Sequence, residues 1–201
     1  MESQARNIVI YGGSFNPPTV AHEAITRACL EVDGVDEVWL MPSGDRIDKQ
    51  YDLSDNDRLR MLSLLCEEVF SSNQKLKISR FEIDNLPRPT ETLRTVEALK
   101  AYYPGNNFQF VFGADSYQSM PSWRNGRELQ KRLGMLIVPR WNISIPSSPN
   151  LTILETPRCT TVSSSQVREN VQAGVSVESM VCSSVCKYIE DSRLYKGLVN
   201  S

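Results

Sequence analysis

A glycine pair and a histidine stand close together near the start of the chain, in a pattern that suits phosphate binding. Gly12 and Gly13 directly follow an apolar run at 7–11, and glycines there let the backbone approach a ligand closely. Residues 14–18 lead into a predicted helix, whose free N–H groups and positive dipole end attract anions. His22, the only histidine, falls in the first turn of that helix. It is either a surface or capping residue or a phosphate ligand, and its position favours the ligand, because a charged imidazole at a helix start needs an anion beside it.

A second candidate segment lies far along the chain at 162–168. The serines at 163–165 could cap a helix and offer hydroxyl and backbone donors, and Arg168 lies about one turn further on. From there its guanidinium could form a bidentate contact with a phosphate. Serine-rich caps followed by an arginine are common, so this segment alone is a weak indication of a site.

The elements that must position these residues alternate between strand and helix. The apolar runs are short, nearly continuous and rich in β-branched or aromatic residues, which is typical of strands covered on both faces. The alternation predicts an α/β fold, a doubly wound, Rossmann-like parallel sheet with helices on both faces, and such folds bind ligands at the carboxyl ends of the strands. We expect one domain over 1–201. The predicted strands are 7–11, 37–41, 76–78, 108–112, 135–138 and 151–154, and the predicted helices are 21–32, 55–70 and 91–103.

Composition narrows the class of protein further. The net charge of −2 does not favour nucleic acid as a partner, and no apolar stretch is long enough for a membrane helix, so we expect a cytoplasmic protein, with the nucleus left open. The five cysteines are an odd number without a CxxC pair, which favours reduced thiols and leaves the role of Cys182 and Cys186 open. A P-loop is excluded because no Gly-Lys-Ser/Thr follows the glycine pair, and the third glycine of GxGxxG is missing.

The two segments together resemble the signatures of the nucleotidylyltransferase superfamily. Gly-Gly-Ser-Phe-Asn-Pro followed by Thr19-x-x-His22 resembles its (H/T)xxH signature, and 162–168 resembles its I-S-S-T-x-I-R signature. The Gly-Ala-Asp-Ser at 113–116 and the closing segment 188–195 are similar to those of the nicotinamide/nicotinate mononucleotide adenylyltransferase family. The chain departs from the family at Thr19, Ala21, Ser165 and Pro89, of which Pro89 bears on how a pyridine ring is stacked.

The resemblance implies transfer of AMP from ATP to nicotinamide or nicotinate mononucleotide, giving NAD or deamido-NAD and pyrophosphate. It implies Mg²⁺ carried with ATP and no metal held by the protein, with a C-terminal helical part at about 163–197 completing the ATP site. The catalytic residues would be His22, Arg168 and Lys49. The ATP-binding residues would be Gly13, Ser14, Phe15, His22, Lys49, Ser163, Ser164, Ser165, Gln166, Val167 and Arg168. The mononucleotide would contact Ser14, Thr92, Gly113, Asp115, Trp123 and Arg140.

Other interpretations stay open at this stage. They are a nucleotide-binding regulatory protein that retains the pocket, and another adenylyltransferase such as phosphopantetheine adenylyltransferase. An NAD-dependent oxidoreductase is disfavoured by the missing GxGxxG. Asp115 could instead cap a helix, Trp123 and Arg140 could serve packing, and the sequence decides neither between nicotinate and nicotinamide nor whether the chain forms a homo-oligomer.

Overall fold

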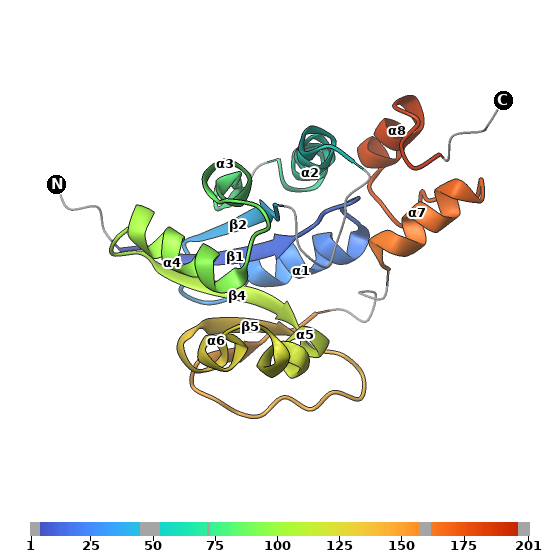
Figure 1. The fold of residues 1–201 in the computed structure, drawn as a ribbon. Helices are drawn as coiled ribbons and strands as arrows, with labels where there is room; N and C mark the ends of the chain where they lie inside the picture. Colours follow the sequence, from blue (N-terminus) through green and yellow to red (C-terminus); the bar gives the residue numbers. More distant parts are fainter. Residues whose placement is uncertain (1–4, 45–52, 72, 157–161, 197–201) are drawn as a thin grey trace.

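The fold is a six-stranded parallel sheet with helices on both faces (Figure 1). The computed structural model describes residues 5–44, 53–71, 73–156 and 162–196. The strand order is β3-β2-β1-β4-β5-β6, and every neighbouring pair is parallel, so the predicted doubly wound, Rossmann-like α/β fold is confirmed. The strands are β1 (Asn7–Gly13), β2 (Glu37–Pro42), β3 (Leu76–Ile78), β4 (Asn107–Gly113), β5 (Gly134–Val138) and β6 (Leu151–Ile153).

The centre of the sheet holds the point where the strand order reverses. β1 pairs with β2 on one side and with β4 on the other, so the connections that leave β1 and β4 diverge to opposite faces. A crevice opens at the carboxyl ends of two such strands because no crossover covers it, and ligands of these folds bind there. The glycine pair at the end of β1 and Gly113 at the end of β4 both lie at this edge.

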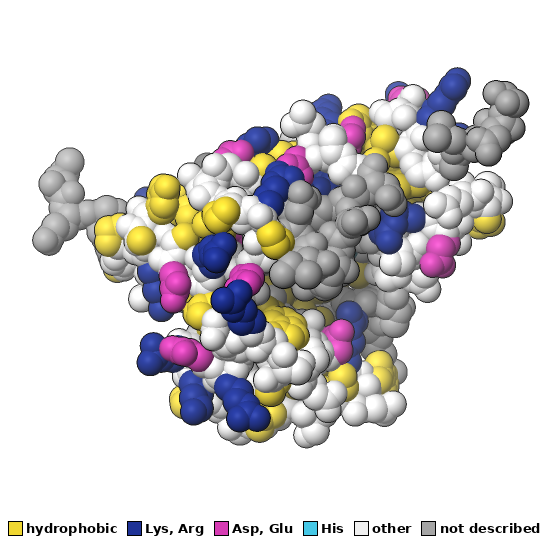
Figure 2. All heavy atoms as spheres, in the orientation of Figure 1, with side chains coloured by type: hydrophobic (Ala, Val, Ile, Leu, Met, Phe, Trp, Pro, Cys, Tyr) yellow, Lys and Arg dark blue, Asp and Glu magenta, His cyan; other side chains and the backbone are white. Residues whose placement is uncertain are grey.

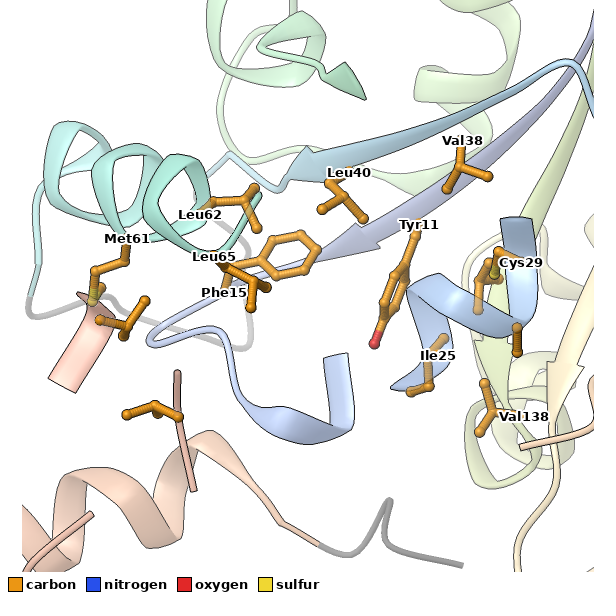
Figure 3. Close-up of a cluster of buried hydrophobic side chains, with 14 of the residues drawn as sticks. Tyr11, Phe15, Ile25, Cys29, Val38, Leu40, Met61, Leu62, Leu65 and Val138 are labelled. Atoms are coloured by element: carbon orange, nitrogen blue, oxygen red, sulfur yellow. The ribbon is translucent and has the colours of Figure 1, made fainter. Parts of the chain in front are cut away.

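Helices cover each face because side chains alternate along the strands. Val9 and Tyr11 face one hydrophobic cluster, which includes side chains of α1, α2, α7 and α8, while Ile8 and Ile10 face a second one, which includes side chains of α3 to α6 (Figure 3 shows the first cluster). The helices are α1 (Val20–Leu30), α2 (Asp55–Phe70), α3 (Phe81–Asn85), α4 (Thr92–Tyr102), α5 (Ala114–Ser119), α6 (Gly126–Arg132), α7 (Ser164–Gln172) and α8 (Ser183–Asp191), with a 3-10 turn, η1 (Met120–Ser122).

The predicted helices are found with small shifts at their ends. α2 has the predicted bounds and is capped by Ser54, whose hydroxyl accepts the Asp57 N–H at 3.2 Å. The prediction for α1 ran two residues too far, and Glu91 caps α4 instead of opening it. Among the described residues, no helix is long and apolar enough to cross a membrane. On the face that Figure 2 shows, basic and acidic side chains are interspersed.

After β6 the chain returns to the first face of the sheet, where α8 packs against α2. Glu68 of α2 accepts the N–H groups of Ser183 and Ser184 at 3.1 and 2.7 Å, which satisfies two free donors at the start of α8. The Tyr188 hydroxyl donates to Asp57 at 2.9 Å. These contacts hold the C-terminal helices beside the edge where β1 ends.

Replacing a residue of the second cluster tests whether that face carries stability. Met135 of β5 is fully buried there, so Met135→Ala is expected to lower the free energy of unfolding by about 2–5 kcal/mol, because a cavity remains where the side chain was. The measurement is urea unfolding followed by circular dichroism. Lys131→Ala, on the exposed surface of α6, is the control, with an expected change within about 0.5 kcal/mol. A loss for Met135→Ala no larger than that of the control would contradict the assignment.

Candidate active site

The loop between β1 and α1 is packed into the protein at its middle. Phe15 is fully buried in the first hydrophobic cluster with a φ of 46°, and Asn16 beside it is 5 % exposed. The ring of Phe15 meets the ring of Tyr11 edge-on at 5.6 Å and lies 5.1 Å from the imidazole of His22 (Figure 3 shows Tyr11 and Phe15). The positive φ at a non-glycine residue is held by this burial. The aromatic ring therefore anchors a loop whose backbone lies at the open edge of the sheet.

His22 occupies the third position of α1 and completes a reciprocal cap with Thr19. The Thr19 backbone N–H donates to His22 Nδ1 at 3.0 Å, and the Thr19 hydroxyl lies 2.8 Å from the same nitrogen. Because a backbone N–H is always a donor, Nδ1 must accept, and the ring proton is assigned to Nε2. The imidazole is thus oriented and fixed in one tautomer by the start of its own helix.

The imidazole is also uncharged at neutral pH. Burial lowers the pKa of His22 to about 4, because it removes hydration that the charged form needs. The ring of Tyr11 stacks on it at 5.9 Å, and burial raises the pKa of that phenol, so it is neutral as well. His22 is both the capping residue and a group able to act on a ligand, but it acts as a neutral donor through Nε2. The contact of His22 with a phosphate stays a prediction, and in the ligand-free protein the imidazole offers a neutral N–H for it.

The start of α7 contacts the same loop from the other end of the chain. Arg168 Nη1 donates to the Asn16 carbonyl at 2.8 Å, and the Ser164 hydroxyl donates to the Pro17 carbonyl at 2.8 Å. The Tyr195 hydroxyl donates to Asn16 Oδ1 at 2.7 Å. The two segments that the sequence analysis singled out, about 150 residues apart, thus meet at one place. Their meeting puts Arg168 and the first free N–H groups of α7 beside the loop between β1 and α1.

Several predicted ATP-binding residues of α7 have structural partners of their own. Ser163 caps the helix, because its hydroxyl accepts the Gln166 N–H at 3.2 Å while Gln166 Oε1 accepts the Ser163 N–H at 2.9 Å. Val167 is fully buried in the first cluster. Ser165 accepts from Arg168 Nη2 at 3.2 Å. Contacts of these residues with ATP stay a prediction, and the Val167 backbone N–H already donates to the Ser163 carbonyl at 3.2 Å.

At the end of β4, Gly113 and Asp115 lie close together with Arg140. The carboxylate of Asp115 folds over Gly113, where a Cβ would lie 2.4 Å from Asp115 Oδ1, so any larger residue at 113 would require the Asp115 side chain to move. Arg140 Nε lies 3.9 Å from the same oxygen, and both side chains are largely exposed. Gly113 is the residue that caps α5, so the alternative that Asp115 is the cap is wrong. The pair is brought together at the open edge, as a ligand site at that edge requires.

The remaining predicted contacts with the mononucleotide lie on the second face. Thr92 is the first residue of α4. Trp123 follows η1 and packs edge-on against Phe112 at 6.1 Å while staying partly exposed. A cavity of about 150 Å³ lies beside the start of α4 and is bounded by Glu91 and Arg124, which pair at 3.0 Å. Packing of Trp123 is therefore observed, and stacking on a ligand stays a prediction. Lys49 lies outside the described residues.

Sequence reasoning missed two charged residues that hold the surrounding loops. Arg58 of α2 is fully buried, and the sequence analysis did not single it out. Its spacing of three, four and seven residues before Met61, Leu62 and Leu65 was the available signal. Glu82 of α3 accepts the Gly44 N–H at 3.2 Å and the Thr95 hydroxyl at 2.7 Å, and no motif marks it.

The chemistry of the assembled site is that of an anion receptor. It gathers a neutral imidazole N–H, a guanidinium and the N-terminus of α7 around the loop that follows the glycine pair. In the described part of the chain, no three His, Cys, Asp or Glu side chains gather where they could hold a metal ion. The four cysteines described are free thiols. These groups are hydrogen-bond donors, so the site is suited to positioning phosphates. None of them is arranged as a base that would remove a proton.

The single histidine allows a direct test of its protonation state. In an NMR titration of the ligand-free protein, the imidazole signal of His22 is expected to titrate with a pKa of about 4 and to show the Nε2–H tautomer. Because the folded-state pKa lies below the ordinary value of 6.5, the folded protein binds fewer protons between the two values, so His22 lowers the free energy of unfolding as pH falls from 6.5 to about 4. A measured pKa near 6.5 would contradict the conclusion that burial destabilises the charged imidazole.

Comparisons with known proteins place the chain in a family. Residues 10–170 match the family described as cytidylyltransferase-like. The nicotinate-nucleotide adenylyltransferase of Bacillus subtilis is 30% identical over 194 residues, which cover 96% of this chain and 100% of that protein. The probable nicotinate-nucleotide adenylyltransferase of Flavobacterium johnsoniae is 28% identical over 196 residues, covering 94% of this chain and 98% of the relative.

A solved structure shares the fold. The nicotinic acid mononucleotide adenylyltransferase of Plasmodium falciparum complexed with NaAD superposes with a TM-score of 0.81 at 24% identity, covering 94% of this chain and 97% of that one. The family match spans most of the chain and the relatives align over nearly their whole length. The chain therefore belongs to the cytidylyltransferase-like family and, within it, to the nicotinate-nucleotide adenylyltransferases, which makes it a nucleotidyltransferase.

Proposed function

We propose that this chain transfers the adenylyl group of ATP to nicotinate mononucleotide, giving deamido-NAD and pyrophosphate. The observation that carries the proposal is the meeting of two segments at the Asn16 and Pro17 carbonyls, where Arg168 and Ser164 bond beside His22 at the end of β1. The names of the relatives favour nicotinate over nicotinamide mononucleotide as the acceptor. The reaction belongs to NAD biosynthesis.

The phosphates of ATP would lie between the loop after β1 and the start of α7. His22 Nε2–H would donate to the α- and β-phosphates, because Nδ1 is already engaged with Thr19. Arg168 uses one N–H on Asn16 and one on Ser165, which leaves further donors of its guanidinium for the β- and γ-phosphates. The free N–H groups and dipole of α7 add to the attraction. Lys49 keeps its predicted role as a further positive charge on the phosphates.

The acceptor would lie across the switch point, at the ends of β4 and α4. Asp115 would accept from ribose hydroxyls, and Arg140, 3.9 Å from it, would contact the phosphate of the mononucleotide. Gly113 and Ser14 would allow close approach of the backbone, while Thr92 and Trp123 would contact the pyridine ring. The two substrates then approach each other from opposite sides of the junction between β1 and β4.

The chemical step needs orientation more than proton transfer. A phosphate oxygen of the mononucleotide attacks the α-phosphorus of ATP, a new P–O bond forms, and the bond from that phosphorus to the bridging oxygen breaks as pyrophosphate leaves. The nucleophile is already an anion, so no base has to remove a proton. Charge grows on the α-phosphate and the leaving group, where the His22 N–H and Arg168 are placed to stabilise it.

Magnesium would arrive as part of the substrate Mg-ATP. The described residues around the loop are donors and cations, and such a set suits phosphate oxygens that already carry a cation better than a bare cation. On the phosphates Mg²⁺ would neutralise the charge of the leaving pyrophosphate. This assignment predicts that the protein alone does not hold the ion.

Pyrophosphate release by the purified protein tests the proposed reaction. With Mg-ATP, release is expected with nicotinate mononucleotide, at a kcat/KM at least about tenfold above that with nicotinamide mononucleotide. Phosphopantetheine, run in parallel, is expected to give none. Pyrophosphate release only with phosphopantetheine would show that the acceptor is phosphopantetheine and would contradict the proposal. ATP binding without release from any of the three would instead favour the regulatory interpretation.

Removing the imidazole tests the role of His22 in the transition state. We expect His22→Ala to lower kcat by about 10²–10³-fold, with a much smaller change in the KM for the mononucleotide, because the donor acts on charge that develops during transfer. The measurement is steady-state kinetics on protein shown by circular dichroism to be folded. Arg27→Ala, an exposed position one turn later on α1, is the matched control. An unchanged kcat in folded His22→Ala would disprove the role.

A further inference from the structure

Arg58 is a charged side chain in the middle of an apolar face. It is fully buried, and the residues three, four and seven positions later on α2 are buried apolar side chains. A buried guanidinium is costly unless it is paired and hydrogen-bonded, so the contacts of such a residue indicate what keeps it there. Arg58 is neither exposed to solvent nor at the surface of the proposed phosphate site.

The guanidinium of Arg58 reaches two loops and one carboxylate. Nη1 donates to the Ser14 carbonyl at 2.9 Å, and Nη2 donates to the Ser43 carbonyl at 2.8 Å and to Asp55 at 2.6 Å. Ser14 follows β1 and Ser43 follows β2, two neighbouring strands of the sheet. Asp55 also binds Arg88, and although burial alone would raise its pKa, the hydrogen bonds from Arg58 and Arg88 lower it, which keeps the carboxylate charged.

Holding a carbonyl also sets the direction of the next N–H. In a trans peptide the C=O of one residue and the N–H of the following residue point to opposite sides. The peptide after Ser43 shows this directly, because its carbonyl faces Arg58 while the Gly44 N–H donates to Glu82 on the other side at 3.2 Å. That peptide is therefore held from both sides.

The peptide after Ser14 is held from one side only. Its carbonyl faces Arg58, so the Phe15 N–H points away from α2, and within the described residues this N–H has no acceptor. The neighbouring Asn16 carbonyl is bound by Arg168 and the Phe15 ring lies against His22, so this N–H belongs to the loop that the proposed ATP phosphates contact. An oriented, unused N–H in that loop suits a phosphate oxygen.

We infer that Arg58 is a positioning residue for ATP: by holding the Ser14 carbonyl, it turns the Phe15 N–H toward the phosphates. The inference rests on the proposed function for its ligand. Arg58 does not touch the substrate, and its effect passes through one peptide plane. Lysine in its place would keep the charge beside Asp55 but could not hold two carbonyls and a carboxylate with one planar fork.

The amide of Phe15 can be observed alone. Ser14-Phe15 is the only Ser-Phe dipeptide in the sequence, so labelling serine carbonyls with ¹³C and phenylalanine nitrogens with ¹⁵N gives a single correlated NMR signal from that peptide. Titration with Mg-ATP is expected to shift this signal in the unmodified protein. In Arg58→Lys the shift is expected to be lost or to need at least about tenfold more Mg-ATP, with kcat for the adenylyl transfer lowered about 10- to 100-fold.

Phe70→Leu is the matched control for lost stability. Phe70 is a buried residue of the same helix, twelve residues and roughly 18 Å along its axis from Arg58, and the change leaves the loop contacts intact. It is expected to lower the unfolding temperature while keeping the Phe15 shift and the kcat of the folded protein. A weakened Phe15 shift together with a lowered kcat, seen in Arg58→Lys and not in Phe70→Leu, would support the positioning role.

Two results would overturn the inference. One is an Arg58→Lys protein whose Phe15 signal and kcat match those of Phe70→Leu, because Arg58 would then serve stability alone. The other is an unmodified protein that binds Mg-ATP without a shift at Phe15. The NMR titration uses ATP without an acceptor, so it stays decisive if the kinetic assay shows no product and the proposed reaction fails.

Discussion

The contact of α7 with the loop after β1 is the interaction on which the site depends. The sheet supplies two strand ends at its switch point, but strand ends alone provide backbone and little charge. Arg168 and Ser164 bind the carbonyls of Asn16 and Pro17, and this docking brings the guanidinium of Arg168 and the N-terminus of α7 to the loop that follows the glycine pair. The caps that Glu68 provides for α8 hold the C-terminal helices against α2 and so maintain the docking.

A second constraint is that one imidazole serves two purposes. Its Nδ1 closes the first turn of α1, and its Nε2 remains as a donor. A cation at a helix N-terminus would oppose the helix dipole, whereas a neutral imidazole does not. The burial that lowers the pKa of His22 therefore makes its place in α1 compatible with a role toward phosphate. The proposed reaction requires no base, so the single N–H at Nε2 is all that the imidazole has to supply.

The fold could be read from the sequence because covered parallel strands leave long apolar runs and their helices carry ordinary caps. Ser54 and the serine at 163 cap where their types indicate. The meeting of the two signature segments rested on resemblance, since no local pattern states that residues 16 and 168 touch. The role of Arg58 was missed because an arginine within a helix is usually interpreted as a surface residue. Only its contacts in the structure show that it is buried. The neutral state of His22 depends on packing by Tyr11 and Phe15, which spacing does not reveal.

The bond between the Tyr195 hydroxyl and Asn16 joins residues 179 apart in the chain. During synthesis the loop after β1 leaves the ribosome early, and the sheet around it can form as β2 and β4 follow. The partners of Asn16 and Pro17 come only with residues 164 to 195. A nascent chain that lacks them could pair its strands but would leave the proposed nucleotide site unfinished, so that site would be completed only after residues 164 to 195 had been synthesised.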